Sequence, residues 1–289
     1  MAADSVPDSP HQAHDEDQSV RHLVELGYVD PQEVAAAEAK RRQQLQEQLK
    51  QAIELNRQGR GQQAAALLLE LAAADPEWIP PHQLLAEIYY RCGQLTETQA
   101  QLDWLAHHGV DTARVAIITA GVALSQREMQ KSLRELEYAR AVEPELPSVN
   151  TLLGTALLRL GRLNDAEDAF REASQQNPAD ARARDGLAAI FLKHGEYEEA
   201  AEWALRALEQ DIHLFRAHYH LGVALAHLNR PEDALTALET AARAEPSKVA
   251  PYFWMSRIAE EQLSDPARSE KYREAASDIL RLRRERRHG

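Results

Sequence analysis

Small and apolar side chains recur along this chain at helical spacing, and the pattern repeats with a period of 34 residues. Within each period one stripe follows the i, i+3, i+4, i+7 spacing of one face of an α-helix, as in Leu153, Gly154 and Leu157. A second helical stripe follows after a short turn. The seven periods begin at residues 45, 79, 113, 147, 181, 215 and 249. The pattern therefore predicts an all-α chain, an α-solenoid of helix–turn–helix pairs.

Three positions of the period carry residues with a defined structural role. The eighth is always small, which lets two helix backbones approach closely: Ala52, Ala86, Ala120, Gly154, Ala188, Gly222 and Ser256. The fifteenth is glycine in four periods, where a positive φ would end the first helix: Gly59, Gly93, Gly161 and Gly195. Pro231 and Pro266 stand nearby in the last two periods and are predicted to begin second helices. The thirty-second is a helix-ending proline in four: Pro76, Pro144, Pro178 and Pro246.

These positions resemble the tetratricopeptide repeat, whose pattern has small residues at positions 8, 20 and 27, a large residue at 24 and Pro at 32. The fourth period fits best, with Gly154, Ala166, Phe170, Ala173 and Pro178 in place, and the resemblance spans residues 45–282. It implies a right-handed superhelix of about seven repeats. Position 20 departs from the pattern in three repeats: Thr98, Ser132 and Arg268. We expect the seventh repeat to be a modified cap, since an end repeat faces water on one side.

The two ends of the chain differ from the repeats. Residues 1–20 hold five acids and no Lys or Arg, and we expect a disordered acidic leader there. Residues 21–44 are predicted to form a short helix at Leu23–Leu26 and then the N-terminal part of a long capping helix. Asp30 would be its N-cap and Pro31 its first residue. Residues 283–289 form a basic tail.

Composition restricts the kinds of partner. The formal net charge is -13, and such a surface repels phosphate groups, so we expect neither nucleic acid nor a membrane as partner. Cys92 is the single cysteine, which excludes an internal disulfide framework and fits a reducing compartment. The first residues do not resemble a signal peptide, and the longest apolar stretch, residues 64–74, is too short to cross a bilayer. We therefore expect a cytoplasmic protein.

The sequence shows no sign of catalysis. It contains no glycine-rich phosphate loop, no HExxH helix, no CxxC pair and no Gly-x-Ser-x-Gly elbow. The paired histidines His107 with His108 and His218 with His220 are spaced so that they point in different directions on a helix. We therefore expect no catalytic residue, no cofactor and no metal, and interpret the chain as non-enzymatic.

The candidate site is a partner-binding groove on the first helices. The resemblance implies that positions 2, 5, 9 and 12 line it, and the residues concerned are Arg114, Ile117, Thr151, Thr155, Leu158, Arg182, Asp185, Leu192, Arg216 and Tyr219. Asp185 is the single charge at positions 5, 9 and 12 of repeats three to six. Such a low charge indicates either an apolar contact surface or burial by tight coiling.

The arginines at position 2 also leave two interpretations open. Arg114, Arg182 and Arg216 could grip a carboxylate of a partner, because guanidinium groups suit bidentate pairing. They could instead pair with Asp111, Asp180 and Asp211. No repeat has the Lys at position 5 with Asn at position 9 that the resemblance would require of a clamp for chaperone tails.

Two hypotheses about function follow. The first is a scaffold that binds a peptide or helical segment of another protein in the groove. The alternative rests on residues 23–31, LVELGYVDP, which resemble the junction before C-terminal repeat arrays in bacterial alkaline-phosphatase-superfamily proteins of the sulfatase or phosphodiesterase type. This second resemblance implies an accessory region that docks onto an alkaline-phosphatase-like domain. No catalytic residue of that family has a counterpart here.

Overall fold

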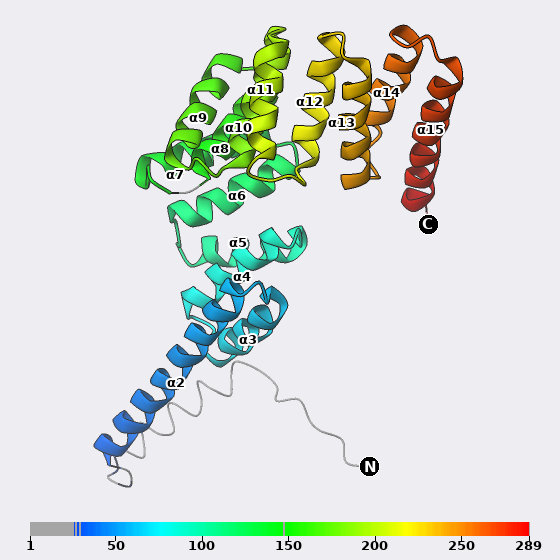
Figure 1. Ribbon diagram of the computed structural model, residues 1–289. Helices are drawn as coiled ribbons and strands as arrows, with labels where there is room; N and C mark the ends of the chain where they lie inside the picture. Colours follow the sequence, from blue (N-terminus) through cyan, green and yellow to red (C-terminus); the bar gives the residue numbers. More distant parts are fainter. Residues whose placement is uncertain (1–25, 27, 29, 147, 289) are drawn as a thin grey trace, which may run out of the picture. The chain divides into compact units, whose positions relative to one another are not determined.

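The computed structural model of the chain describes residues 26, 28, 30–146 and 148–288, with side chains up to residue 285. Within these residues all the regular structure is helical, in fourteen α-helices (Figure 1). The predicted all-α class is therefore confirmed. The leader predicted over residues 1–20 and most of the short helix predicted at Leu23–Leu26 lie outside the described residues.

The chain divides into two compact units, each described here by itself. Unit 1 is Met1–His108 and unit 2 is Gly109–Gly289. Unit 1 contains α2 (Pro31–Arg57), α3 (Gly61–Ala74), α4 (Ile79–Arg91) and α5 (Leu95–His107). Unit 2 contains α6 (Ala113–Ser125), α7 (Met129–Val142), α8 (Val149–Arg159), α9 (Leu163–Gln176), α10 (Ala181–His194), α11 (Tyr197–Leu208), α12 (Phe215–His227), α13 (Pro231–Ala244), α14 (Ala250–Glu261) and α15 (Pro266–His288).

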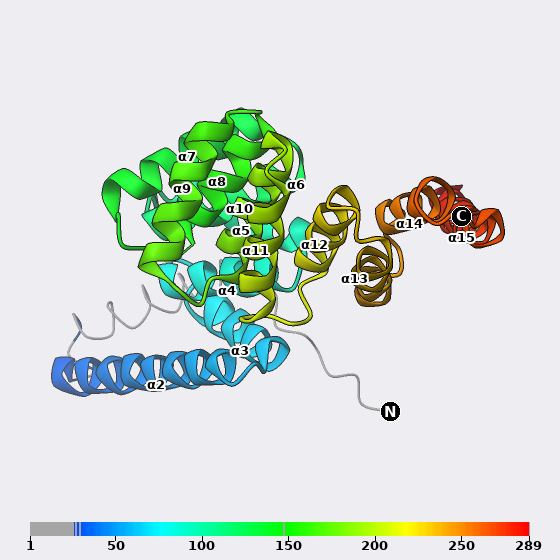
Figure 2. The same cartoon turned by 45° about the horizontal axis from the view of Figure 1, so that its top comes forward.

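The helix boundaries follow the turn residues of the repeat. Gly59, Gly93, Gly161 and Gly195 have φ angles of 78°, 73°, 78° and 81°, the left-handed region in which glycine carries no Cβ penalty. Pro231 begins α13 and Pro266 begins α15. Each repeat thus supplies an even-numbered first helix and an odd-numbered second helix, as the periodicity predicts. In Figure 2 the pairs α12–α13 and α14–α15 follow one another along unit 2.

The small residues at position 8 allow the close helix contacts expected of them. A Cβ atom on Gly154 would lie 2.7 Å from Cδ1 of Phe170, and one on Gly222 would lie 2.6 Å from Cγ of Leu238. The core of unit 2 is built around such contacts, with Phe170 and Leu187 among its fully buried side chains. Unit 1 has its own apolar cluster around Leu68 and Leu85.

The long helix α2 begins at the predicted residue. The Asp30 carboxylate accepts a hydrogen bond from the backbone N–H of Gln32 at 2.8 Å, and Pro31 is the first helical residue. Between residues 31 and 44 every side chain except that of Val34 is exposed. Packing against α3 and α4 starts at Leu45 and Leu49, where the first repeat begins.

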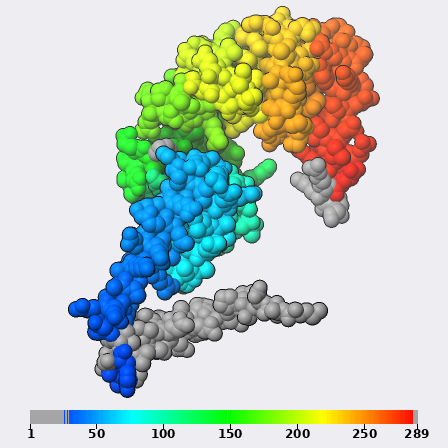
Figure 3. All heavy atoms as spheres, turned by 60° about the horizontal axis from the view of Figure 1, so that its bottom comes forward, coloured from blue at the N-terminus to red at the C-terminus, as the bar shows by residue number. Residues whose placement is uncertain are grey.

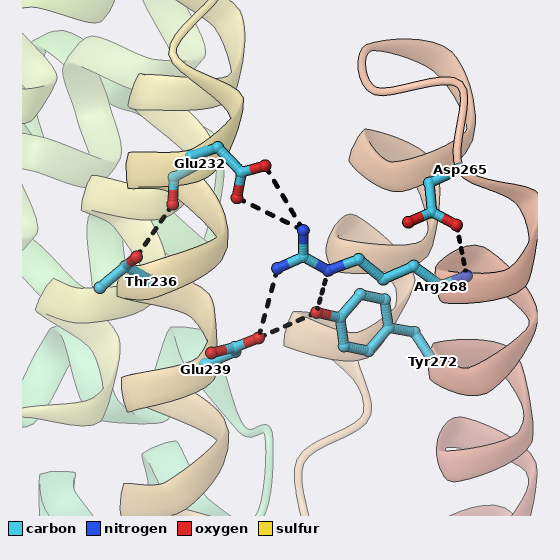
Figure 4. A network of polar contacts seen from close by, with 6 residues as sticks. All are labelled: Glu232, Thr236, Glu239, Asp265, Arg268 and Tyr272. Atoms are coloured by element: carbon cyan, nitrogen blue, oxygen red, sulfur yellow. Dashed lines mark hydrogen bonds and ion pairs between the residues drawn. The ribbon is translucent and has the colours of Figure 1, made fainter.

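The helix pair α14–α15 carries Arg268 in place of a small residue at position 20, and a polar network joins it to α13 (Figure 4). Arg268 on α15 reaches α13, with Nη1 3.3 Å from Oε2 of Glu232 and Nη2 4.0 Å from Oε1 of Glu239. Arg268 Nε donates to the hydroxyl of Tyr272 at 3.2 Å, and this hydroxyl donates to Glu239 at 2.9 Å. The buried small residue is the next one along, Ser269, whose Oγ lies 3.0 Å from that of Ser256.

Candidate functional site

The first helices of unit 2 form its inner face. Contacts between successive repeats join α6 to α8, α8 to α10, α10 to α12 and α12 to α14, whereas second helices of successive repeats share no interface of comparable size within the described residues. An array whose first helices are closer together curves toward them. The curved band of green to red atoms in Figure 3 is unit 2 seen from one side. We call the surface presented by α6, α8, α10, α12 and α14 the inner face.

Charge is distributed unevenly between the two sets of helices. The first helices α6, α8, α10 and α12 together contain six Lys or Arg residues and a single acid, Asp185. The second helices α7, α9, α11 and α13 also contain six Lys or Arg residues, but twelve acids. With Arg257, Glu260 and Glu261 of α14, the five helices of the inner face hold seven Lys or Arg residues and three acids, so they are cationic in a chain whose net charge is -13.

The one acid of α6, α8, α10 and α12 is already paired with side chains of the same chain. Asp185 on α10 is 2% exposed, and two side chains of α12 contact its carboxylate. Nδ1 of His220 lies 2.6 Å from Oδ1, and Nε of Arg216 lies 3.1 Å from Oδ2. The Arg216 side chain remains 47% exposed. Arg216 therefore pairs inside the chain, and its partner is Asp185 of the preceding repeat, not the neighbouring Asp211.

The two threonines of the predicted groove are bonded within the scaffold. Thr151 is buried, and its hydroxyl donates to Asp180 at 2.5 Å. Thr155 donates to the carbonyl of Thr151 at 2.8 Å. The other Asp180 oxygen caps α10 by accepting from the backbone N–H of Arg182 at 2.9 Å. The coiling of the repeats therefore buries Thr151 and Asp185, and these two residues do not form an open contact surface.

Several guanidinium groups of the inner face have no carboxylate beside them. Within the described residues no acid lies within ion-pair distance of Arg114, Arg159 or Arg182, and Arg114 and Arg182 are exposed. Nη1 of Arg159 donates to the carbonyl of Leu124, at the end of α6, at 2.8 Å. Partial burial lowers the pKa of Arg159, and the positive charges of Arg216 and Arg127 lower it further. This guanidinium therefore lies near other cations.

Aromatic side chains occupy the C-terminal part of the inner face. Trp254 Nε1 donates to the hydroxyl of Tyr219 at 3.2 Å, and burial raises the pKa of Tyr219 while this hydrogen bond lowers it in part. The Phe215 ring stacks 6.2 Å from that of Tyr219. Phe253, at position 5 of the seventh repeat, is 57% exposed. Leu158 on α8, Leu192 on α10 and Ile117 on α6 are half-buried.

Sequence reasoning missed Phe253, His220 and Arg159 as members of this surface. Phe253 could have been found, because it occupies the same position as Ile117 and Tyr219, one repeat beyond the set considered. The pairing of His220 with Asp185 joins residues 35 apart. It depends on how successive helices are offset, which the period alone does not give.

The described residues provide neither a cluster of metal ligands nor a membrane-spanning helix. No group of three or more His, Cys, Asp or Glu side chains could hold a metal ion in that part of the chain. Among the helices described there, none combines the length and the apolar character needed to cross a membrane. Cys92, in unit 1, is an exposed free cysteine.

Comparison with known proteins identifies the repeat. A tetratricopeptide repeat family model matches residues 151–213 and 215–250. The peroxisomal targeting signal receptor of Candida albicans is 27% identical over 124 residues, which is 43% of this chain and 19% of that receptor. The alignment thus spans about a fifth of the length of this relative.

Solved structures share the fold. The hetero-tetramer Cut9-Hcn1 of the APC/C aligns with a TM-score of 0.65 at 15% identity, covering 73% of this chain and 42% of that one. The pilF protein of Pseudomonas aeruginosa aligns with a TM-score of 0.60 at 16% identity, over 77% and 100% of the two chains. A tetratricopeptide repeat protein of Parabacteroides merdae gives 0.58 at 17%, over 82% and 93%. The chain therefore carries tetratricopeptide repeats, and its fold is a tetratricopeptide α-solenoid.

Proposed function

We propose that this protein is a non-enzymatic scaffold that binds a peptide or helical segment of another protein along the inner face of unit 2. The observation that carries the proposal is the apolar content of the first helices: Phe253 on α14 has an exposed fraction of 57%, and Tyr219, Leu158 and Leu192 are half-buried. Large exposed apolar side chains that lie next to others mark contact sites for proteins. The family fits this function, since tetratricopeptide arrays are protein-interaction modules.

The proposed contact residues are the accessible ones of the predicted groove. Leu158, Leu192 and Tyr219 would supply apolar contact, and Arg114, Arg182 and Arg216 the polar contacts. Thr151 and Asp185 would act through the scaffold, because both are buried. We further propose that the scaffold works in the cytoplasm, where an exposed thiol such as that of Cys92 stays reduced.

Site-specific photo-crosslinking in cells of the native host tests the proposal. In one variant p-benzoylphenylalanine replaces Phe253 on the inner face. In the matched control it replaces Leu205 on α11, a second helix, where the side chain is 50% exposed. We expect a discrete crosslinked protein with the first variant and none, or a different pattern, with the second. The same partner crosslinked with equal yield from both positions would contradict binding on the inner face.

The alternative function, an accessory region of an alkaline-phosphatase-like hydrolase, gains no support from an observation in the described residues. The junction on which it rests lies mostly outside them. The same crosslinking experiment would support this alternative if the captured protein carried such a domain.

A further inference from the structure

We infer that the inner face of unit 2 selects protein segments rich in Asp and Glu, with Arg159, Arg182 and Arg216 as the cations that meet the carboxylates. This inference rests on the proposed function and specifies the chemistry of the partner.

The first argument is the separation of charge between the two sets of helices. The first helices α6, α8, α10 and α12 carry six cations and one acid, and the second helices α7, α9, α11 and α13 carry six other cations and twelve acids. One of the first-helix cations, Arg184, is directed toward α11, where its Nη1 donates to the carbonyl of Arg206. Solubility alone would be served by acids on either set. α14 carries Arg257 with Glu260 and Glu261, and α15 is rich in arginine, so this separation belongs to α6–α13. There the acids of the second helices leave a positive field over the first helices, which steers an acidic segment toward them.

The second argument is that the cations lack acids of their own. Arg182 on α10 is exposed and has no acid within ion-pair distance among the described residues. Arg216, at the equivalent position on the neighbouring helix α12, uses Nε for Asp185 and keeps 47% of its side chain exposed. Arg159 is bonded to a carbonyl, not a carboxylate. Each guanidinium therefore has donors left for a bidentate contact.

The third argument concerns the repulsion among these cations. The charges of Arg216 and Arg127 disfavour the protonated form of Arg159, in addition to the effect of partial burial, and so lower its pKa. An incoming carboxylate would relieve this repulsion. The arrangement costs energy in the free protein, and binding would recover part of it.

A protein carboxylate fits this surface better than a nucleic-acid phosphate. A polyanion extending beyond the few inner cations would meet the acids of the second helices and a chain of net charge -13. The half-buried Leu158 and Leu192 and the exposed Phe253, which lie on the same set of helices, favour apolar residues interspersed with acids, as in a short protein segment.

The test is selection from a phage-displayed library of random dodecapeptides fused through their C-termini, so that only side chains can supply carboxylates. The wild-type chain is compared with Arg182→Gln and Arg159→Gln. Arg140→Gln is the control, since Arg140 is an exposed arginine on the second helix α7. Arg182→Gln breaks no described ion pair, and circular dichroism and thermal melting confirm that each variant folds.

We expect peptides selected on the wild type and on Arg140→Gln to be enriched in Asp and Glu over the unselected library. A synthetic selected peptide should bind Arg182→Gln about tenfold more weakly, the effect of one charge-assisted contact. Selected peptides without acidic enrichment, or with affinity unchanged in Arg182→Gln and Arg159→Gln, would overturn the inference and leave the scaffold function standing. Failure to select any peptide would contradict the scaffold function itself. Tighter binding of an oligouridylate, with the same dependence on Arg159 and Arg182, would overturn the inference in favour of nucleic acid.

Discussion

The ring of Phe170 on α9 packs so closely on the backbone of Gly154 on α8 that a Cβ atom there would lie 2.7 Å from Cδ1 of the ring. The same ring lies against Gly186 on α10. Phe170 therefore fixes the distance between its own helix pair and also between its repeat and the next. The small residue at position 8 is a packing requirement and not a consequence of helix propensity.

We predict that Gly154→Ala destabilises the protein. In an exposed helix interior this change would stabilise by about 0.5–1 kcal/mol, because glycine has the larger backbone entropy. Here overpacking against Phe170 should reverse the sign and lower the free energy of unfolding by about 1–3 kcal/mol. Urea denaturation followed by circular dichroism measures the difference.

A double-mutant cycle isolates the contact with Phe170. Phe170→Leu makes room for the added methyl group, so Gly154→Ala should cost clearly less in that background. Equal costs in both backgrounds, or a gain in stability from Gly154→Ala alone, would show that the ring yields without strain.

The repeat architecture could be predicted from the sequence because it depends on residues whose role is local. Glycine at position 15 ends a helix through its own φ angle, as Gly161 does at 78°, and a small residue at position 8 has one meaning in every repeat. Seven copies of the same signal reinforce one another, so that a departure such as Thr98 does not obscure the pattern.

The polar chemistry of the inner face could not be predicted in the same way. The pairing of Asp185 with Arg216 and His220 crosses from one repeat to the next, and it depends on the offset of α10 against α12. The sequence marks Arg268 as unusual at position 20, but its contacts with Glu232 and Glu239 on the preceding helix pair depend on the direction in which α15 packs. The sequence defined which residues share a helix face, and the structure defined which of them are accessible.

The buried carboxylate of Asp185 should matter more for stability than an exposed one. Asp185→Ala removes the acceptor of Arg216 and His220 between α10 and α12, and it leaves the largely buried His220 without this partner, whereas Arg216 is half exposed. We expect the free energy of unfolding to fall by about 1–3 kcal/mol. Asp233→Ala, which breaks the exposed pair with Arg230, is the control and should cost less than about 1 kcal/mol. Comparable losses from both substitutions in urea denaturation would contradict a structural role for Asp185.

The network around Arg268 predicts a particular response of the cap to alkali. Burial raises the pKa of Tyr272 above its ordinary value of 10.0, and Glu239 raises it further, while Arg268 lowers it. The neutral phenol therefore contributes stability that is fully present below pH 10. That stability is lost as the pH rises through the higher pKa of the folded chain, because the unfolded chain releases this proton first. The protein should become less stable above pH 10, and Tyr272→Phe should make this decline shallower. The loss of stability that remains in Tyr272→Phe would come from other tyrosines, such as Tyr219, whose pKa is also raised.

Removing Arg268 should also change the pKa of Tyr272. Without the positive charge of Arg268 the phenolate loses a stabilising partner, so Arg268→Ala should raise the pKa of Tyr272 still further. Ultraviolet absorbance of phenolate, recorded against pH for Arg268→Ala with and without Tyr272→Phe, gives the titration of this one group by difference. Hydrogen exchange of the amides of α15 provides an independent measurement, and we expect it to be faster in Arg268→Ala because the links to Glu232 and Glu239 are lost. An unchanged Tyr272 titration together with unchanged exchange would mean that apolar packing alone, through residues such as Tyr272 and Ala276, holds the cap in place.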